Sequence, residues 1–242
     1  LLEINLDNAI KNLNQNSEIV KLGRMNWWTV EYGLIGNIKN PKIYGAGLLS
    51  SVAEGYNALN TNVKKIPLDL DIINFDYDIT SQQPQLFITK NFNSLINVLK
   101  TFEKTLSSNI GGTYALKQSQ ESRMVNTIQF DSGIQIAGVL NQIKYNESEP
   151  IYIKFKGPIQ LGKNNKQIDD HGPVRYQDGF FLPLGKSRIK IDNLKNKDRF
   201  KLIKINYDSG ISIKANLMGE IKESNLFFLK DGNISYKNKK LF

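Results

Sequence analysis

The sequence predicts an α+β protein in which a mainly helical first part is followed by an all-β domain, barrel-like or a sandwich. Before residue 107, apolar residues recur at helical spacing in several segments, whereas from Met124 onward short β-type runs alternate with turn signals. The stretch Ser-Ser-Asn-Ile-Gly-Gly at residues 107–112 separates the two patterns. We therefore expect two domains, residues 1–107 and 108–242.

The composition is ordinary for a globular protein. The chain has 242 residues, of which 40% are hydrophobic and 23% are charged. No apolar run approaches the roughly 20 residues that a membrane-spanning helix needs, and the first residues do not resemble a signal peptide. The absence of cysteine excludes disulfides and thiolate metal sites, and we expect a cytoplasmic protein. Because the chain opens on Leu1 rather than on methionine, we expect it to begin inside a longer protein.

The net charge of +9 is unevenly distributed. Residues 1–107 contain ten basic and ten acidic residues, so the whole excess lies in residues 108–242. A basic second half can meet nucleic acid or an anionic surface. We favour a solvated, Lys-rich β surface over nucleic-acid binding, because the lysines are scattered and form no Arg cluster.

Four helices are expected in the first domain, at residues 6–15, 17–33, 51–59 and 91–106. Ser17 and Asn91 are suitable N-cap residues, and Ser51-Val-Ala-Glu54 has the capping-box pattern. The remaining segments are a turn-rich connection with a short strand at residues 42–44, a loop at 60–67, an extended run at 68–77, a turn at 82–84 and a strand at 86–89.

The second domain is expected to consist of short strands. They cover residues 125–130, 134–145, 151–155, 199–207, 211–218, 226–229 and 234–236. Turn signals separate them, among them Lys-Asp-Gly-Asn at residues 230–233. Regular spacing of this kind is typical of a barrel or sandwich.

One hairpin sequence occurs twice in this domain. Ile-Gln-Phe-Asp-Ser-Gly-Ile-Gln-Ile at residues 128–136 recurs as Ile-Asn-Tyr-Asp-Ser-Gly-Ile-Ser-Ile at residues 205–213. In each copy Asp-Ser-Gly supplies a tight turn and the isoleucines alternate toward one face. We expect the two hairpins to close a barrel with pseudo-twofold symmetry, which implies no chemistry.

A single carboxylate, Glu31, lies in the aromatic and β-branched stretch Asn-Trp-Trp-Thr-Val-Glu-Tyr-Gly-Leu-Ile at residues 26–35. A charge among apolar residues is costly unless something pairs with it. The stretch Tyr-Gly-Ala-Gly-Leu-Leu-Ser-Ser at residues 44–51 follows, with a Gly-x-Gly turn that leads into two serines. We interpret the two stretches as parts of one site.

The only histidine, His171, lies in a glycine-containing segment beside Asp169 and Asp170. These residues could form a metal or phosphate site. We favour an ordered loop with His171 hydrogen-bonded to Asp169 or Asp170, because one His and two adjacent Asp are a poor set of metal ligands. The sequence contains no P-loop, no nucleophile elbow and no arrangement that fits a Ser-His-Asp triad.

The two stretches around Glu31, together with Gln-Pro at residues 83–84 and Lys-Lys-Ile-Pro-Leu at 64–68, resemble the aromatic amino acid hydroxylases. Within that family they resemble phenylalanine 4-hydroxylase, in the long form found in some bacteria. The resemblance covers roughly residues 17–106, which would be the C-terminal part of the catalytic domain. Residues 107–242 look like the C-terminal extension of the long form.

The resemblance implies a non-haem iron monooxygenase. Such an enzyme uses Fe(II), tetrahydrobiopterin or a related tetrahydropterin, and O₂ as co-substrate, to hydroxylate phenylalanine to tyrosine. The iron is held by two histidines and one glutamate. Glu31 matches the glutamate ligand, and Ser50 matches a serine that orients one of the histidine ligands.

Four further positions match the family's substrate pocket. Trp27, Tyr32 and Gly47 match residues that line it, and Tyr77 matches a tyrosine near its mouth. Trp27 can equally be read as a core residue. The sequence departs from the family at Asn26, where an aromatic residue is usual, and at Ala53, where glycine is usual.

A larger departure concerns the histidines. The family's two ligands precede the glutamate, whereas no histidine here precedes His171. We therefore expect the C-terminal portion of a hydroxylase, inactive alone, with a small-molecule substrate and no membrane partner. The alternative is a non-catalytic interaction module with a basic β domain. Phenylalanine, tyrosine and tryptophan hydroxylases share this core, so the substrate stays open, as does the oligomeric state.

Overall fold

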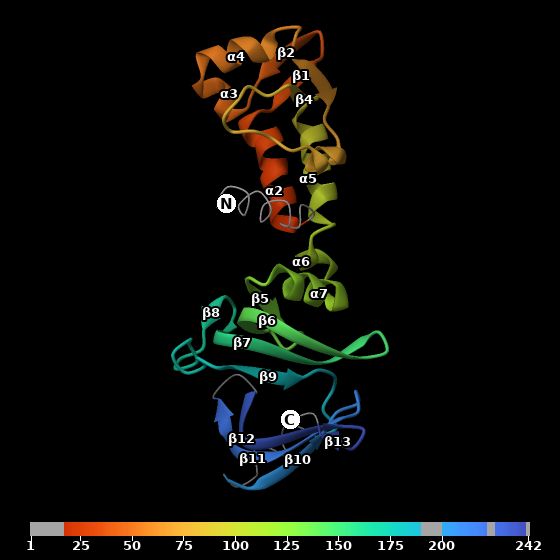
Figure 1. The fold of residues 1–242 in the computed structure, drawn as a ribbon, viewed down its shortest axis with the longest axis vertical. Helices are drawn as coiled ribbons and strands as arrows, with labels where there is room; N and C mark the ends of the chain where they lie inside the picture. The colour runs from red at the N-terminus through yellow and green to blue at the C-terminus, as the bar shows by residue number, and fades with distance from the viewer. Residues whose placement is uncertain (1–16, 190–199, 222–225, 241–242) are drawn as a thin grey trace, which may run out of the picture. The chain divides into compact units, whose positions relative to one another are not determined.

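The computed structural model describes residues 17–189, 200–221 and 226–240. It divides into two compact units, Leu1–Ile110 (unit 1) and Gly111–Phe242 (unit 2), which are described separately (Figure 1). The predicted mixture of helices and sheets is confirmed. The boundary predicted between residues 107 and 108 falls within α6 (Ser107–Ile110), and the helix predicted at residues 6–15 lies outside the described residues.

The helix that carries Glu31 begins where it was predicted. The Ser17 side chain accepts a backbone hydrogen bond and caps α2 (Glu18–Asn26). The helix then widens into a π-turn, η1 (Trp27–Glu31), in which the Tyr32 N–H donates to the Trp27 carbonyl oxygen over 2.9 Å. Single π-turns inside helices are frequent at functional sites.

Unit 1 is built around a four-stranded sheet with the strand order β2-β1-β4-β3. The strands are β1 (Leu34–Asn37), β2 (Asn40–Ile43), β3 (Lys64–Pro67) and β4 (Gln85–Thr89). β1 and β2 form an antiparallel hairpin, whereas β4 runs parallel to both β1 and β3. β3 lies where a loop was predicted. Its partner β4 is distant in the sequence, so local signals do not predict this pairing.

Besides α2 and α6, the described part of unit 1 contains the helices α3 (Ala46–Ser50), α4 (Val52–Leu59) and α5 (Phe92–Glu103). The side chains of Ser51 and Asn91 accept N-terminal backbone hydrogen bonds of α4 and α5, which confirms both predicted caps. The run predicted to be extended at residues 68–77 instead contains the 3₁₀ helix η2 (Leu70–Asn74). Asp69 accepts a hydrogen bond from the Asp71 N–H and starts this turn.

Trp28 is the largest fully buried side chain of unit 1. Its indole N–H donates to the Phe75 carbonyl over 2.9 Å, and its ring meets Phe87 of β4 edge-on at 5.1 Å. Met25, Ile72 and Phe102 belong to the same apolar cluster. Trp28, the residue after Trp27, therefore anchors the helix that carries Glu31 to the sheet.

The described part of unit 2 contains two antiparallel sheets and one helix. The first sheet comprises β5 (Val125–Gln129), β6 (Ile134–Asn146), β7 (Glu149–Lys163), β8 (Lys166–Gln167) and β9 (Gly179–Pro183). The second comprises β10 (Leu202–Asn206), β11 (Ile211–Ile221), β12 (Leu226–Tyr236) and β13 (Lys239–Lys240). Ile151 and Tyr152 of β7 pack in one cluster with Ile211, Ile213 and Ile234 of the second sheet.

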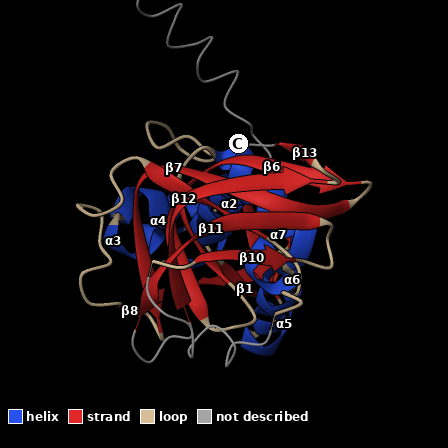
Figure 2. Ribbon diagram, turned by 90° about the horizontal axis from the view of Figure 1, so that it is seen from below, coloured by secondary structure: helices blue, strands red, loops and turns tan. Residues whose placement is uncertain are grey.

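Two expectations for this unit are wrong. The described strands form two separate sheets and not a closed barrel, and α7 (Gly112–Ser122) contradicts an all-β domain. Helix α7 packs on β6, and Leu116 joins the core of the first sheet. Figure 2 colours α7 blue, as a helix, and the strands red. Few apolar residues mark this helix in the sequence, so it depends on that packing.

The turn predicted at residues 230–233 lies inside the continuous strand β12. The register shifts opposite Ala215, and Asp231 adopts a left-handed φ of 52°. Lys-Asp-Gly-Asn does not end the strand, because β11 pairs with β12 on both sides of it. The unmatched residues of β12 between these two paired stretches form a β-bulge.

The duplicated hairpin is confirmed and extends further than its sequence. The turns end on Gly133 and Gly210, with φ of 80° and 86°. Each copy is preceded by a non-glycine residue in the left-handed region, Arg123 at 53° and Phe200 at 68°. The register shifts after Ala137 in one copy and after Lys214 in the other, which are equivalent positions. We conclude that residues 123–167 and the described residues of 200–240 are two copies of one β element.

No helix in the described ranges is both long and apolar enough to cross a membrane.

Candidate active site

Glu31 ends the π-turn η1 and is half-buried. Within the described residues no ion pair involves its carboxylate. The carboxylate faces Gly47 of α3, because a Cβ at Gly47 would lie 3.2 Å from Glu31 Oε2 and 3.2 Å from Tyr32 Cε2. The structure therefore brings together three of the predicted site residues.

The Gly-x-Gly turn exists because two backbone segments approach closely. The N–H groups of Tyr44 and Gly45 both donate to the Gly33 carbonyl oxygen, over 3.2 Å and 3.0 Å. A Cβ at Gly45 would lie only 2.4 Å from the Glu31 carbonyl oxygen, so no other residue fits without a shift. Glycine at Gly45 and Gly47 thus places α3 against the residue that carries the carboxylate.

The predicted aromatic residues form a stack beside Glu31. Trp27 lies between Tyr32, at a centroid distance of 4.6 Å, and Tyr77, at 4.4 Å. The rings are inclined by 22° and 11°, so both contacts are stacked. The indole N–H of Trp27 is buried and has no hydrogen-bond acceptor in the described part of the chain. This N–H is an unpaired donor at the site.

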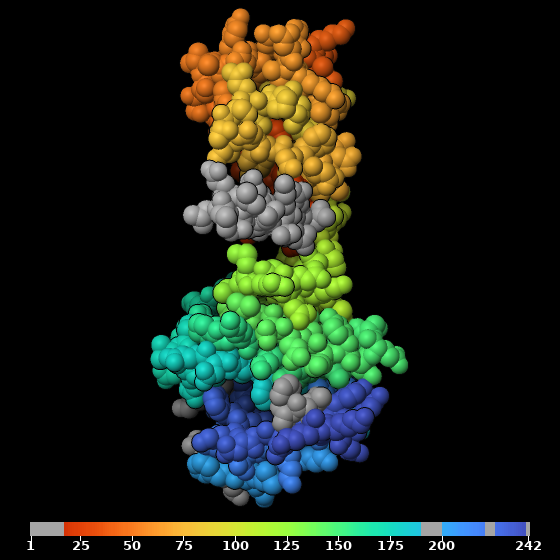
Figure 3. Space-filling model, in the orientation of Figure 1, coloured from red at the N-terminus to blue at the C-terminus, as the bar shows by residue number. Residues whose placement is uncertain are grey.

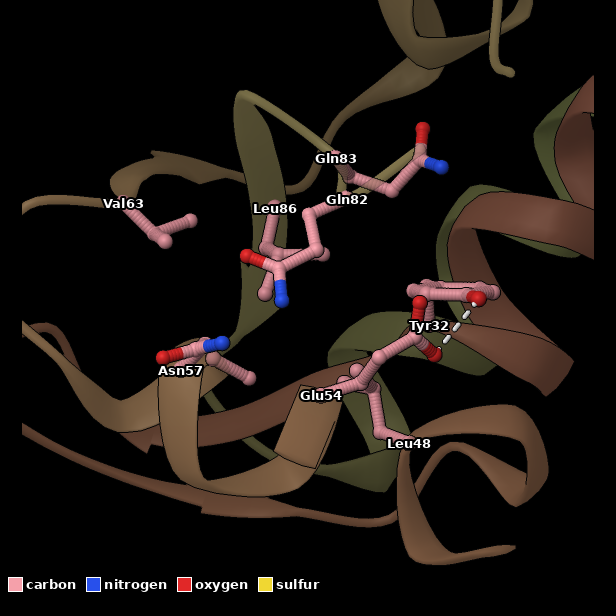
Figure 4. Close-up of a pocket in the computed structure, with 9 residues that line it drawn as sticks. Tyr32, Leu48, Glu54, Asn57, Val63, Gln82, Gln83 and Leu86 are labelled. Atoms are coloured by element: carbon pink, nitrogen blue, oxygen red, sulfur yellow. Dashed lines mark hydrogen bonds between the residues drawn. The ribbon is translucent and has the colours of Figure 1, made fainter. Parts of the chain in front are cut away.

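Tyr32 is fixed at its other end by a residue that the sequence analysis assigned only to a helix cap. Its hydroxyl donates to Glu54 Oε2 over 2.9 Å (Figure 4). Burial first, then this hydrogen bond and the charges of Glu54 and Glu31, raise the pKa of Tyr32 to about 12. A cavity beside this pair has a volume of about 20 Å³, room for roughly one water and too small for an amino acid.

Tyr77 is held in place by a second contact that the sequence did not predict. Arg24, which is 5% exposed, forms an ion pair with Asp76 and donates to the Ile73 carbonyl over 3.0 Å. Asp76 precedes Tyr77, so Arg24 ties the segment after η2 to α2. The sequence offered one signal for this contact, the single arginine in the helix expected at residues 17–33.

The Ser50 hydroxyl donates to the Gly47 carbonyl over 2.8 Å at the end of α3, and Ser50 is exposed. Asn26 and Ala53, the two departures from the family pattern, are also exposed. These residues therefore take no part in the core of unit 1.

Residues 9–149 match the family model described as biopterin-dependent aromatic amino acid hydroxylase, which is more than half of the chain. The chain belongs to this hydroxylase family. The match begins before α2 and continues through β6, so it passes beyond residue 106, where the predicted resemblance ended.

Individual hydroxylases are similar over a shorter region. A probable aromatic amino acid hydroxylase of Chlamydia pneumoniae is 36% identical over 95 residues, which are 39% of this chain and 26% of that protein. Phenylalanine-4-hydroxylase of Mus musculus is 37% identical over 89 residues, which are 36% of this chain and 20% of that protein. Tryptophan 5-hydroxylase of Xenopus laevis is 35% identical over 108 residues, which are 44% of this chain and 22% of that protein. The chain thus spans about a fifth to a quarter of the length of these relatives.

Solved hydroxylase structures match a similar share. Phenylalanine hydroxylase of Chromobacterium violaceum, in a structure with bound oxidised Fe(III), is 34% identical over 33% of this chain and 30% of that chain, with a TM-score of 0.31.

The hydroxylase chain does not hold a complete metal site in its described part. No group of three or more His, Cys, Asp or Glu residues there is arranged to bind a metal ion. Glu31 is one carboxylate donor without further ligands nearby, so these residues alone do not fit a three-ligand iron site.

His171 lies in unit 2 and has a different partner from the one predicted. It is 5% exposed, and Nδ1 lies 2.6 Å from the Tyr176 hydroxyl, so the hydrogen-bond partner of Nδ1 is Tyr176 and not Asp169 or Asp170. Tyr176 reaches the ring because the loop folds back along β7, where the Ile159 and Leu161 N–H groups donate to the Tyr176 and His171 carbonyls. These backbone and side-chain hydrogen bonds order the loop around His171.

Proposed function

We propose that this chain is part of a phenylalanine 4-monooxygenase that uses Fe(II), tetrahydrobiopterin and O₂, and that Glu31 is its carboxylate ligand to iron. The observation that carries the proposal is the half-buried Glu31 carboxylate at the end of a π-turn, facing Gly47 and without an ion-pair partner in the described residues. A divalent cation would offset the cost of this charge.

The other two iron ligands are proposed to be histidines outside this sequence, because its only histidine lies in unit 2. The chain would then contribute one ligand, and we assign no catalytic step to it alone. Iron, when bound in the assembled site, supplies the activation of O₂. This chain's own contribution is to hold the carboxylate and to build one wall of the substrate pocket.

The wall would consist of the stacked rings of Tyr32, Trp27 and Tyr77. An aromatic face is suited to the ring of an aromatic amino acid, and Gly47 leaves room beside the carboxylate. The unpaired N–H of Trp27 offers a donor to a ligand or to the missing polypeptide. We propose phenylalanine as the substrate, although phenylalanine and tryptophan hydroxylases are about equally similar to this chain.

Ser50 is proposed to orient one of the absent histidine ligands. Its hydroxyl is exposed, and its oxygen can still accept a hydrogen bond while it donates to Gly47. We further propose that the protein is cytoplasmic and that unit 2 includes the C-terminal extension of the bacterial long form.

The test is the iron content of the intact protein, meaning this chain with the remaining hydroxylase sequence. Glu31→Gln keeps the size of the side chain but removes the charge, and iron bound per chain should fall at least tenfold. The control is Glu103→Gln, which changes an exposed carboxylate of α5 and should leave iron unchanged. Full iron binding by the Glu31 variant would refute the ligand assignment. Tyrosine formation from phenylalanine and tetrahydropterin then decides the substrate.

A further inference from the structure

A hollow on the outward face of the first sheet of unit 2 has no role in the hydroxylase site. It lies on β5 to β8, which are coloured green to teal in Figure 3. Its volume is about 190 Å³. The lining residues are Thr127, Gln135, Ala137, Gln160, Gly162, Asn165 and Lys166.

The floor of the hollow is made by two small residues on neighbouring strands. Ala137 pairs with Thr127 on one side and Gln160 on the other, while Gly162 pairs with Gln135. Glycine inside a strand weakens it and often marks a place where a ligand approaches the backbone closely. Gly162 does not have a positive φ, but a Cβ there would lie 3.0 Å from the backbone carbonyl oxygen of Lys166, so glycine also permits the close approach of β8. The short side chain of Ala137 leaves the rest of the floor open.

The second copy of the β element carries larger side chains at the positions equivalent to Ala137 and Gly162. Position 137 corresponds to Lys214, which is exposed and lies directly opposite Lys204 on β10. Position 162 corresponds to Ser235 on β12. The same fold thus accepts a long side chain at the position of Ala137.

The rim is ordered by one buried amide. Gln135 is 8% exposed, and its Nε2 donates to Gln129 Oε1 over 2.9 Å and to Asn165 Oδ1 over 2.7 Å. Its Oε1 accepts from the Asn165 N–H over 2.8 Å. Because one of these bonds uses the side-chain oxygen of Asn165, its NH₂ group remains as a donor at the rim, whereas Gln129 supports Gln135 from outside the lining.

The donors and the charge of the rim determine what it can bind. Lys166 is the one charged residue of the lining, and Thr127 adds a hydroxyl. Gln160 contributes an amide that can both donate and accept. A donor-rich, singly positive site matches a ligand that is rich in acceptor oxygens and carries negative charge.

We propose that this hollow binds a small hydroxylated oxyanion of about the size of a sugar acid. The oxyanion lies beside Lys166 and the free amide group of Asn165, and the rest of the ligand occupies the space above Ala137 and Gly162. The site is independent of the iron site and of the proposed hydroxylation.

The test is a titration of the ¹⁵N-labelled full chain followed by backbone amide NMR, with D-gluconate, inorganic phosphate and D-glucose as probes. We expect saturable shifts at Thr127, Gln135 and Asn165 with gluconate, and much weaker ones with uncharged glucose. Phosphate shifts at the same amides would show that the oxyanion alone suffices. Glucose binding equal to that of gluconate would overturn the proposal.

The decisive variant is Ala137→Lys, because the fold already carries lysine at the equivalent position of the other copy. It should weaken gluconate binding at least tenfold, and Lys166→Gln should weaken it several-fold while leaving the hollow open. Lys214→Ala is the matched control and should change nothing. An unaltered thermal unfolding midpoint establishes that each variant is folded. No saturable shift with gluconate or phosphate, or shifts that survive Ala137→Lys, would refute the site.

Discussion

The Tyr32 hydroxyl links the aromatic stack to helix α4. One face of its ring contacts Trp27, and its hydroxyl donates to Glu54, whose own N–H is bound by the helix cap Ser51. A change at Glu54 should therefore reach the stack without touching any proposed iron ligand.

Replacing Glu54 by glutamine should lower the pKa of Tyr32 from about 12 toward the ordinary value of 10. The change removes the charge of Glu54, whereas burial, the larger cause, remains, so the pKa should stay above 10. NMR of ¹³Cζ-labelled tyrosine, with Tyr32→Phe to assign the signal, measures this directly. The stability of unit 1 should fall by about 1 kcal/mol at most. An unchanged Tyr32 titration would mean that the hydrogen bond does not form in solution.

At the scale of elements, the glycines of unit 1 do not all serve the same purpose. Gly45 lies where a Cβ would meet the Glu31 carbonyl oxygen at 2.4 Å. At Gly23 in α2, the nearest atom, the Tyr77 hydroxyl oxygen, would be 3.6 Å away, which is an ordinary contact. The first glycine is required by packing and the second is not.

The two substitutions to alanine should therefore have opposite signs. Gly45→Ala should destabilise unit 1 by about 1–3 kcal/mol, because the backbone of α3 must move away from η1. Gly23→Ala should stabilise it by up to about 1 kcal/mol, because alanine is the better helix former. Urea unfolding monitored by tryptophan fluorescence measures both, since Trp27 and Trp28 are the only tryptophans. Equal effects of the two changes would contradict the close approach at Gly45.

At the scale of the whole molecule, each hydrophobic cluster of the described residues lies within one unit. His171 belongs to unit 2, where it contacts Tyr176 and Phe228. Burial first, and then the nearby charge of Arg175, lower the pKa of His171, while Asp170 acts in the opposite direction. The folded state therefore prefers the neutral imidazole.

Lowering the pH should destabilise unit 2 selectively. Because the pKa of His171 is lower in the folded state than its ordinary 6.5, the unfolded chain binds the proton first. The contribution of neutral His171 to the stability of unit 2 is fully present above pH 6.5 and is lost as the pH falls below that value. Unfolding followed by far-UV circular dichroism should show this loss of stability, whereas unfolding followed by tryptophan fluorescence, which reports on unit 1, should not. His171→Phe should abolish the dependence, and its persistence in that variant would assign it to other groups.

Local features were predictable because they depend on residues close together in the chain. Ser17, Ser51 and Asn91 cap their helices through bonds to backbone groups three residues ahead. The two Asp-Ser-Gly turns likewise follow from glycine at the left-handed position. Helix α7 and strand β3 were missed because the partners that stabilise them, β6 and β4, lie elsewhere in the sequence.

The candidate site divides in the same way. The sequence by itself determined the hydroxylase family and placed Glu31, Trp27 and Gly47 in the motifs that resemble it, because motif and spacing are properties of the chain. Only the tertiary structure decided that Tyr32 bonds to Glu54 and that Arg24 holds the segment before Tyr77. These contacts join residues 22 and 52 positions apart, and no local pattern encodes which distant side chains will meet when the core closes.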